Sequence, residues 1–338
     1  MDRRVAYPCS RRAFLKGVTL AGTAGLLGLK PQRLAAEPPP ETTTIRLVQS
    51  PVICFSPQFV AEELLTAEGF TDVQYIKAAA GPYKALAAGE ADVNTGLGGR
   101  FIIGVDAGDP IVILAGAHAG CFELFGTERI RSVRDLKGRT VRVPGLGSSH
   151  HVFIAAMAAY VGLDPRKDII FVTPPMDEAM RLLAEGKIDA IMGFPPEPQE
   201  LRAKKIGRVV VDTGRDRPWS QYFCCMLAGN RTFVQRHPVA TKRALRAIMK
   251  ANQVCALEPD RAARLLVDKG YAKNYDYAFQ TVQALPYAKW REFNPEDTVR
   301  FHALRLHEAG MIQSSPKEII AQGTAWRFIN ELKQELKG

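Results

Sequence analysis

The chain has 338 residues, of which 46% are hydrophobic and 24% are charged. This balance is typical of globular proteins and excludes a wholly disordered, collagen-like or polytopic membrane chain. At roughly 150 residues per domain, the length predicts about two domains. Six of the ten net positive charges lie in residues 1–36, which hold seven basic residues and one acidic residue. The remainder carries 38 basic and 34 acidic residues, so no nucleic-acid partner is indicated.

The first 36 residues have the pattern of a cleaved export signal. A basic segment that contains Arg11, Arg12 and Lys16 precedes a weakly apolar run over residues 17–29. Such a run spans about 20 Å as a helix, too short for a bilayer core of about 30 Å. The small residues Ala35 and Ala36 follow, as at a cleavage site.

Serine, paired arginines, Phe-Leu and lysine over residues 10–16 resemble a twin-arginine signal. The resemblance implies export of the folded chain by the twin-arginine machinery, with cleavage near Ala36 and a periplasmic mature protein. The alternative is a merely basic or amphipathic N-terminus. Residues 37–44, rich in Pro, Glu and Thr, are predicted to be a linker. No later apolar stretch reaches 18 residues, so no further membrane span is expected.

Short strands alternate with helices along the body of the chain. The first series predicts strands over 45–49, 73–76, 91–94 and 111–114, and helices over 59–67, 82–89 and 101–107. The second predicts strands over 140–143, 169–172, 190–192 and 209–211, and helices over 150–161, 177–183 and 197–203. After residues 222–227 the pattern is mostly helical. Interleaved helices and apolar strands indicate an α/β fold with parallel sheets.

Five cysteines follow the signal: Cys54, Cys121, Cys224, Cys225 and Cys255. Their number is odd, Cys224 and Cys225 are adjacent, and there is no C-x-x-C or zinc-like spacing. Buried free thiols are therefore expected, with no metal and no cofactor.

The order of several phrases carries a family resemblance. They are Lys84–Asp92, Asp135–Arg139, Gly145–Ser149, Tyr160–Pro165 and Ala184–Ala190. In this order, after an export signal, they resemble the periplasmic solute-binding proteins of ABC importers, in the nitrate/sulfonate/taurine class that includes carriers of thiamin-pyrimidine precursors. The resemblance implies a type II periplasmic binding fold with two lobes, each a mostly parallel sheet flanked by helices, and a ligand cleft between them. Lobe 1 is expected over 45–128 and 222–338, and lobe 2 over 129–221.

The function that this resemblance implies is non-catalytic. A monomer would capture a small solute between its lobes and deliver it to an ABC permease and its ATPase subunit at the inner membrane. The solute would be a nitrate-, sulfonate- or taurine-like anion, or an aromatic or pyrimidine compound. An enzyme on the same fold, such as a pyrimidine-precursor synthase or an aromatic decarboxylase, and a metal-handling or sensory binding protein are the alternatives.

The predicted ligand-binding residues lie beyond the carboxyl ends of the strands, where the crevice of an open parallel sheet lies. They are Ser50, Cys54, Phe55, Ser56, Gly98, Gly99, Arg100 and His118 in lobe 1, Gly147, Ser148, Ser149, His150 and Phe194 in lobe 2, and Trp219 at the return crossing.

The strongest signal is the loop Gly145–Ser149, where glycines and serines open a helix whose free N–H groups favour an anion. Its alternative is plain helix capping by Ser148 or Ser149. Arg100 would clamp an anion or lie in solvent. Trp219 would cover a bound ring or pack the hinge. A weaker hypothesis groups His118, Cys121, His150 and His151 as a metal site.

Overall fold

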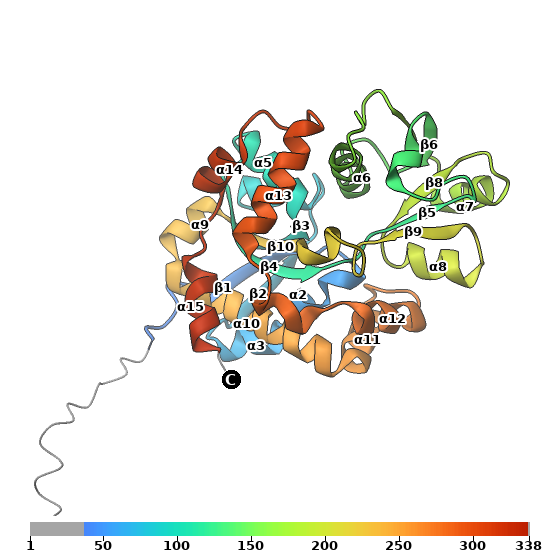
Figure 1. Cartoon of the computed structure of the whole chain (residues 1–338). Helices are drawn as coiled ribbons and strands as arrows, with labels where there is room; N and C mark the ends of the chain where they lie inside the picture. Colours follow the sequence, from blue (N-terminus) through green and yellow to red (C-terminus); the bar gives the residue numbers. More distant parts are fainter. Residues whose placement is uncertain (1–36, 337–338) are drawn as a thin grey trace, which may run out of the picture. The chain divides into compact units, whose positions relative to one another are not determined.

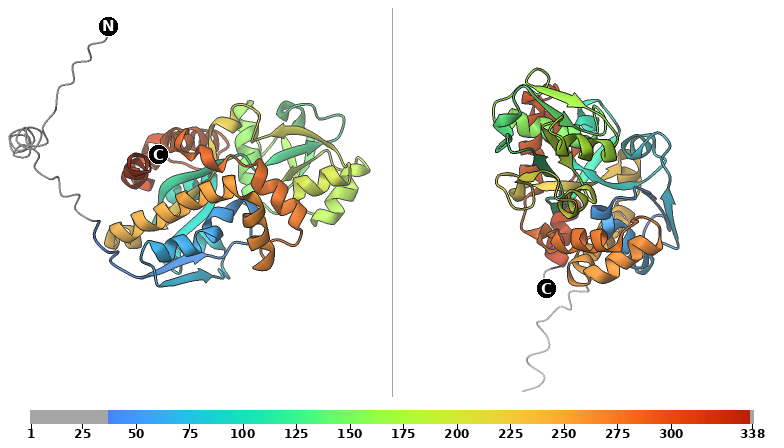
Figure 2. Two further views of the ribbon diagram at one scale, coloured as in Figure 1. Left: turned by 90° about the horizontal axis from the view of Figure 1, so that it is seen from below. Right: turned by 90° about the vertical axis from the view of Figure 1, so that its right-hand side faces the viewer.

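Two five-stranded sheets form the centre of the part of the chain that the structure describes, residues 37–336 (Figures 1 and 2). The coordinates are a computed structural model. The predicted export signal, with Arg11 and Arg12, lies outside the described residues. No helix within the described residues is long and apolar enough to cross a membrane.

The first sheet belongs to lobe 1 and has the strand order β2-β1-β3-β10-β4. Its strands are β1 (Thr44–Val48), β2 (Asp72–Ile76), β3 (Val93–Leu97), β4 (Ile111–Ala119) and β10 (Phe223–Asn230). β1 pairs in parallel with β2 and β3, whereas β10 runs antiparallel to β3 and β4. Every residue of β4 and β10 is buried, because helices cover both faces of the sheet at these strands.

The second sheet belongs to lobe 2 and has the order β7-β6-β8-β5-β9. Its strands are β5 (Glu123–Gly126), β6 (Arg139–Arg142), β7 (Ile169–Val172), β8 (Ala190–Gly193) and β9 (Arg208–Asp212). β6 is parallel to β7 and β8, and β5 runs antiparallel to β8 and β9. Each sheet therefore has one strand that opposes the others, and the expectation of two lobes with mostly parallel sheets is confirmed.

Helices flank both sheets. In lobe 1 they are α2 (Ser56–Val60), α3 (Glu62–Ala67), α4 (Pro82–Ala88), α5 (Gly98–Asp106), α9 (Arg231–Arg236), α10 (Pro238–Leu257), α11 (Pro259–Asp268), α12 (Tyr275–Ala284), α13 (Pro295–Glu308), α14 (Pro316–Gly323) and α15 (Arg327–Glu335). In lobe 2 they are α6 (Ser149–Tyr160), α7 (Met176–Ala184) and α8 (Glu197–Ala203). Four 3₁₀ turns complete the described elements: η1 (Ile53–Phe55), η2 (Val133–Leu136), η3 (Trp219–Gln221) and η4 (Tyr287–Arg291).

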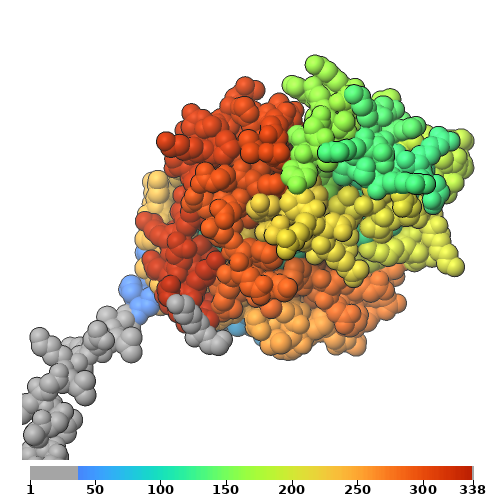
Figure 3. All heavy atoms as spheres, viewed as in Figure 1, coloured from blue at the N-terminus to red at the C-terminus, as the bar shows by residue number. Residues whose placement is uncertain are grey.

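The long helix α10 shows why the C-terminal helices pack closely. Ala240, Ala244, Ala247 and Ala251 are buried along one stripe at helical spacing. Small side chains let neighbouring elements approach, and α10 packs against α2, α3, α11 and α15. On the face seen in Figure 3, residues of lobe 2 in green and yellow lie against the orange C-terminal helices of lobe 1.

Three features differ from the sequence prediction. β5 was not expected, and because it starts at Glu123 the chain enters the second sheet before residue 123 rather than near residue 128. β3 continues to Leu97 and β4 to Ala119, beyond the predicted strand ends. The physical reason is pairing with β10, which provides hydrogen-bond partners for residues whose glycine- and alanine-rich sequence carries little strand signal of its own.

Candidate functional site

Two crossings of the main chain connect the lobes, one from β4 to β5 and one from β9 to β10. Thr213 joins them: its Oγ1 accepts the N–H groups of Cys121 at 3.2 Å and Phe122 at 3.0 Å, and donates to the carbonyl of Phe122 at 2.8 Å. Gly120, with φ +70°, lies so close to Gly214 that a Cβ would be 2.5 Å from its Cα. The crossings are thus held side by side at the position of a hinge.

Arg100 of lobe 1 contacts the loop before α6 in lobe 2. Arg100 Nη1 donates to the carbonyl of Gly147 at 2.6 Å, and its guanidinium lies 5.0 Å from the centre of the Tyr83 ring. Tyr83 accepts the N–H of Leu97 at 2.9 Å. Burial raises the pKa of Tyr83 to about 12, and hydrogen bonding opposes the rise only in part. The structure therefore brings Arg100 of lobe 1 to Gly147, two residues before the start of α6 in lobe 2.

The N-terminus of α6 has one capped and two uncapped N–H groups. Ser148 is the N-cap residue, and its hydroxyl accepts the N–H of His151 at 3.3 Å. The N–H groups of Ser149 and His150 are hydrogen-bonded to no other residue within 37–336. The capping alternative for Ser148 is therefore observed, and the free N–H groups stand next to Arg100 with the positive end of the helix dipole.

Glu197 organises the wall of lobe 2 next to this loop. Its Oε1 accepts from Arg142 Nη1 at 3.1 Å, and its Oε2 accepts from His150 Nε2 at 3.2 Å and from the N–H of Phe194 at 2.9 Å. Burial raises the pKa of Glu197, but the hydrogen bond and charge of His150 outweigh burial and hold this pKa below its usual value. The Phe122 ring packs against His150 and Phe194. Two predicted residues, His150 and Phe194, are thus placed by a carboxylate that was not predicted.

Four cysteine side chains lie close together in lobe 1, beside the first crossing. The Sγ atom of Cys121 lies 2.8 Å from that of Cys224 and 3.8 Å from that of Cys225. Cys54 is their neighbour, and the Sγ atoms of Cys54, Cys121 and Cys225 all lie within 4.8 Å of one another. All five cysteines of the described residues are buried and free, as expected.

Ionisation within this cluster is uneven. Burial raises the pKa of the Cys54, Cys121 and Cys224 thiols well above the usual range. Burial also opposes ionisation of Cys225, but hydrogen bonds from the other three thiols and the charge of His118 hold its pKa well below that range. Burial lowers the pKa of His118, but the Cys225 thiolate outweighs burial and raises it.

The remaining predicted residues are packed in the protein interior. Ser50 and Phe55 are buried, and the Ser56 hydroxyl donates to the carbonyl of Ile53. Gly98 and Gly99 open α5, where Cβ atoms would lie 3.0 Å from Met226 Sδ and Val152 Cγ1. Trp219 packs against Phe153, Tyr160 and Phe301, which corresponds to the hinge-packing alternative.

The grouping of His118, Cys121, His150 and His151 as one metal site is wrong for His150 and His151. His150 donates to Glu197, and His151 Nδ1 accepts the N–H of Gly147 at 3.0 Å while its ring packs on Phe171. Burial lowers the pKa of His151. Cys121 lies in the cysteine cluster instead, with Cys54 and Cys225.

A pocket of about 340 Å³ opens between the lobes on the side of α12. Its lining combines lobe 2 residues, including Glu123, Gln199 and Arg202, with Thr281 of α12, and Cys121 reaches it from the hinge. Glu123 and Arg202 form an ion pair across it. The sequence offered no signal for this lining, because α12 and α8 are far apart in the chain.

The paired lobes, the two crossings and the mixed sheets define the periplasmic-binding-protein fold. The chain belongs to the NMT1-like family, whose profile matches residues 38–267.

Curated relatives match parts of the chain. It is 31% identical over 112 residues to the bicarbonate-binding protein CmpA of Synechococcus elongatus, a match that covers 32% of this chain and 24% of that protein. It is 25% identical over 182 residues to the taurine-binding periplasmic protein of Escherichia coli, with 52% of this chain and 55% of that protein covered. The matched segments thus span about a quarter and about half of these relatives.

Solved structures match nearly the whole described chain. The nitrate-binding protein NrtA from Synechocystis PCC 6803 aligns with a TM-score of 0.69 at 18% identity, over 89% of this chain and 90% of that one. The alkanesulfonate-binding protein SsuA from Xanthomonas axonopodis pv. citri, bound to MOPS, gives 0.64 at 17% identity over 86% and 100%. The desulfurization enzyme DSZB gives 0.60 at 16% identity over 86% and 99%. These likenesses establish the fold.

Proposed function

We propose that the protein is an exported solute receptor that binds a small anion between its lobes and delivers it to an ABC permease. The observation that carries this proposal is the contact between Arg100 of lobe 1 and the loop before α6 in lobe 2. Thr213 joins the two main-chain crossings that connect these lobes. A ligand held by groups from both lobes favours the closed arrangement over the open one, which is the basis of hinge closure. Relatives named for bicarbonate, taurine, nitrate and sulfonates support a small anion as the solute class.

The chemistry at this position suits an oxyanion. The guanidinium of Arg100 has N–H groups beyond the one that reaches Gly147, and the free N–H groups of Ser149 and His150 point out of the helix end. Ser149, the first residue of α6, adds a hydroxyl group there. Together they supply directional hydrogen bonds and positive charge without a titratable anion in the loop itself.

An enzyme on the same fold is the second candidate, because DSZB shares the fold and because the low pKa of Cys225 would suit a nucleophile. Cys225 is only 1% exposed, however, and its neighbours on β10 are buried as well. A nucleophile needs contact with its substrate, so the burial of Cys225 favours binding over catalysis.

A solute screen tests the proposal. Thermal unfolding of the mature protein is measured with nitrate, bicarbonate, taurine, alkyl and aromatic sulfonates, carboxylates and pyrimidines. A solute at a hundred times its Kd stabilises the protein by about 2.7 kcal/mol, a clear rise in Tm. Replacing Ser149 by alanine is then expected to weaken the solute about ten- to hundredfold, since a hydrogen bond to a charged group contributes about 1.5–3 kcal/mol.

Ser315→Ala is the matched control for Ser149→Ala. Ser315 caps α14 with Glu318 in a capping box far along the chain from the crevice, so its loss lowers stability by about 1 kcal/mol without changing the Kd. If Ser149→Ala keeps the wild-type Kd for an anion that binds the protein, the Ser149 hydroxyl has no part in binding. Chemical conversion of that anion by the purified protein would support the enzyme instead.

Export by the twin-arginine route is part of the same proposal and rests on residues 10–16. Replacing Arg11 and Arg12 by lysine is expected to leave uncleaved precursor in the cytoplasm, because that pathway reads the arginine pair rather than charge alone. Cell fractionation with an antibody to the mature protein measures this. Normal periplasmic accumulation of the double variant would rule out the twin-arginine route while leaving the solute-binding proposal intact.

A further inference from the structure

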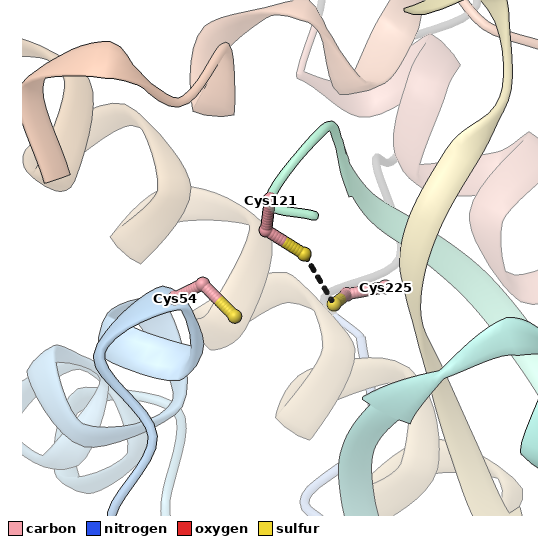
Figure 4. A group of neighbouring side chains, drawn as sticks. All are labelled: Cys54, Cys121 and Cys225. Atoms are coloured by element: carbon pink, nitrogen blue, oxygen red, sulfur yellow. Dashed lines mark hydrogen bonds between the residues drawn. The ribbon is translucent and has the colours of Figure 1, made fainter. Parts of the chain in front are cut away.

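Three cysteines from distant parts of the chain point their thiols toward one another (Figure 4). Cys54 comes from η1, Cys121 from the first crossing and Cys225 from β10. All three are buried, and their Sγ atoms lie within 4.8 Å of one another. A tetrahedral metal with metal–sulfur bonds of about 2.3 Å places its sulfur ligands about 3.8 Å apart. The Cys121–Cys225 Sγ distance is 3.8 Å.

His118 lies beside this group without belonging to it. Its Nδ1 faces main-chain carbonyls, at 3.1 Å from the oxygen of Gly120 and 3.3 Å from that of Ala119, and donates its hydrogen there. These hydrogen bonds fix the orientation of the ring next to the thiols.

Tyr287 holds the two sides of this group in position. Its ring packs edge-on against His118, with the ring centres 5.1 Å apart. Its hydroxyl donates to the carbonyl of Cys54 at 2.9 Å. Such contacts outside the ligand set fix the orientation of the ligands before a metal arrives.

We propose that Cys54, Cys121 and Cys225 bind one thiophilic d¹⁰ metal ion, Zn²⁺ or Cu⁺. Thiolates are ligands of tetrahedral zinc sites, and soft thiolates also select Cu⁺. The fourth thiol, Cys224, lies 2.8 Å from Cys121 and supports the site from outside the ligand set. The pocket between the lobes reaches Cys121 and gives the ion a route from solvent.

The site differs from the proposed anion site and does not depend on it. Its ligands come from lobe 1 and the hinge, whereas the α6 N-terminus belongs to lobe 2. A bound ion would tie the Cys121 crossing to η1 and β10, and so stabilise lobe 1 against unfolding. Packing of four thiols as small apolar groups is the competing explanation. It does not account for three thiols from separate elements pointing toward one another.

The test uses the reduced, metal-free mature protein without any solute. Zn²⁺ and, under anaerobic conditions, Cu⁺ are titrated in competition with a chromophoric chelator, while proton release is followed in weak buffer. We expect one ion per chain and release of protons on binding, since a cysteine thiol must lose its proton to become a metal ligand. Co²⁺ in place of Zn²⁺ should give the visible absorption of tetrahedral thiolate coordination. The ion that binds more tightly is the metal that the site prefers.

Cys225→Ser is expected to weaken metal binding at least about a hundredfold, because it removes a ligand. Cys255→Ser is the matched control: Cys255 is a free, fully buried thiol on α10 outside the cluster, and its loss should leave the affinity unchanged. Near-ultraviolet circular dichroism checks that each variant is folded, and Cys54→Ser replaces any variant that is not. Three outcomes would each overturn the proposal. The folded wild-type protein binds neither ion, it forms a Cys121–Cys224 disulfide instead of binding metal, or Cys225→Ser and Cys255→Ser lose the same amount of metal affinity. Solute binding is measured independently of metal binding, so failure of the metal-site proposal leaves the solute-binding proposal unaffected, and the reverse also holds.

Discussion

Replacing Glu197 by glutamine is expected to lower the free energy of unfolding by about 3 kcal/mol, because removing one partner of a buried ion pair leaves the other charge uncompensated. The charge left behind is that of Arg142, whose side chain is 6% exposed and which also donates from Nε to the carbonyl of Pro174 at 3.3 Å. His150 and the N–H of Phe194 lose their acceptor as well. Chemical denaturation at pH 7 measures the loss.

Glu185→Gln is the matched control. Glu185 pairs with Arg181 one helical turn away at 2.8 Å, and both side chains are exposed. Water screens such an exposed pair, so this variant should unfold almost as the wild type does. Equal losses in the two glutamine variants would show that Arg142 reaches water or another acceptor once Glu197 is gone.

The pH dependence of the free energy of unfolding gives a second test of the role of Glu197. Its pKa in the fold lies below the ordinary value of 4.5, because the hydrogen bond from His150 and the charges of His150 and Arg142 outweigh burial. A carboxyl group with a lowered folded pKa stabilises the protein above its unfolded pKa, and this contribution is lost as pH falls through the folded pKa. The difference in stability between wild type and Glu197→Gln should therefore persist down to about pH 4.5 and shrink below it.

The wild-type protein is expected to lose about 3 kcal/mol of stability between pH 6.5 and pH 4 through His302 alone. His302 lies on α13 among the rings of Phe153, Phe301 and Tyr222, and its Nε2 donates to the carbonyl of Phe223 at 3.3 Å. Burial lowers its pKa from 6.5 to about 4, and the hydrogen bond to Phe223 opposes this only weakly. The unfolded chain then binds a proton between these two pH values that the folded chain does not, so stability falls as pH falls through this window.

His302→Gln removes the titrating group and keeps a donor for Phe223. Stability curves of both proteins from pH 7.5 to pH 4 should diverge, with the wild type falling more steeply, while other titrating groups cancel in the difference. Parallel curves would mean that the ring is protonated within the fold or reaches solvent. Because Phe153 belongs to α6 and His302 to α13, the same measurement reports on the contact between the lobes.

The sequence by itself determined the alternation of strands and helices, the two-lobed class and the burial of the cysteines. These follow from local periodicity: runs such as Ile111–Leu114 and the helix over 150–161 carry their signal within a few residues. It also placed Arg100 and Ser149 at the crevice, because βα loops meet at the carboxyl edge of a parallel sheet. The contact of Arg100 with Gly147 of lobe 2 is seen in the structure.

Only the tertiary structure decided which distant residues share a site. β5, four residues long, becomes a strand because β8 and β9 provide partners on both sides. The fold brings together Cys54, Cys121 and Cys225, which are up to 171 residues apart in the chain. No local spacing in the sequence predicts such a group. The sequence predicts Glu197 only as the first residue of a helix, yet in the fold its carboxylate contacts Arg142 and His150. Long-range pairing is decided by burial and by the need to satisfy buried polar groups in three dimensions, and a one-dimensional pattern does not contain this information.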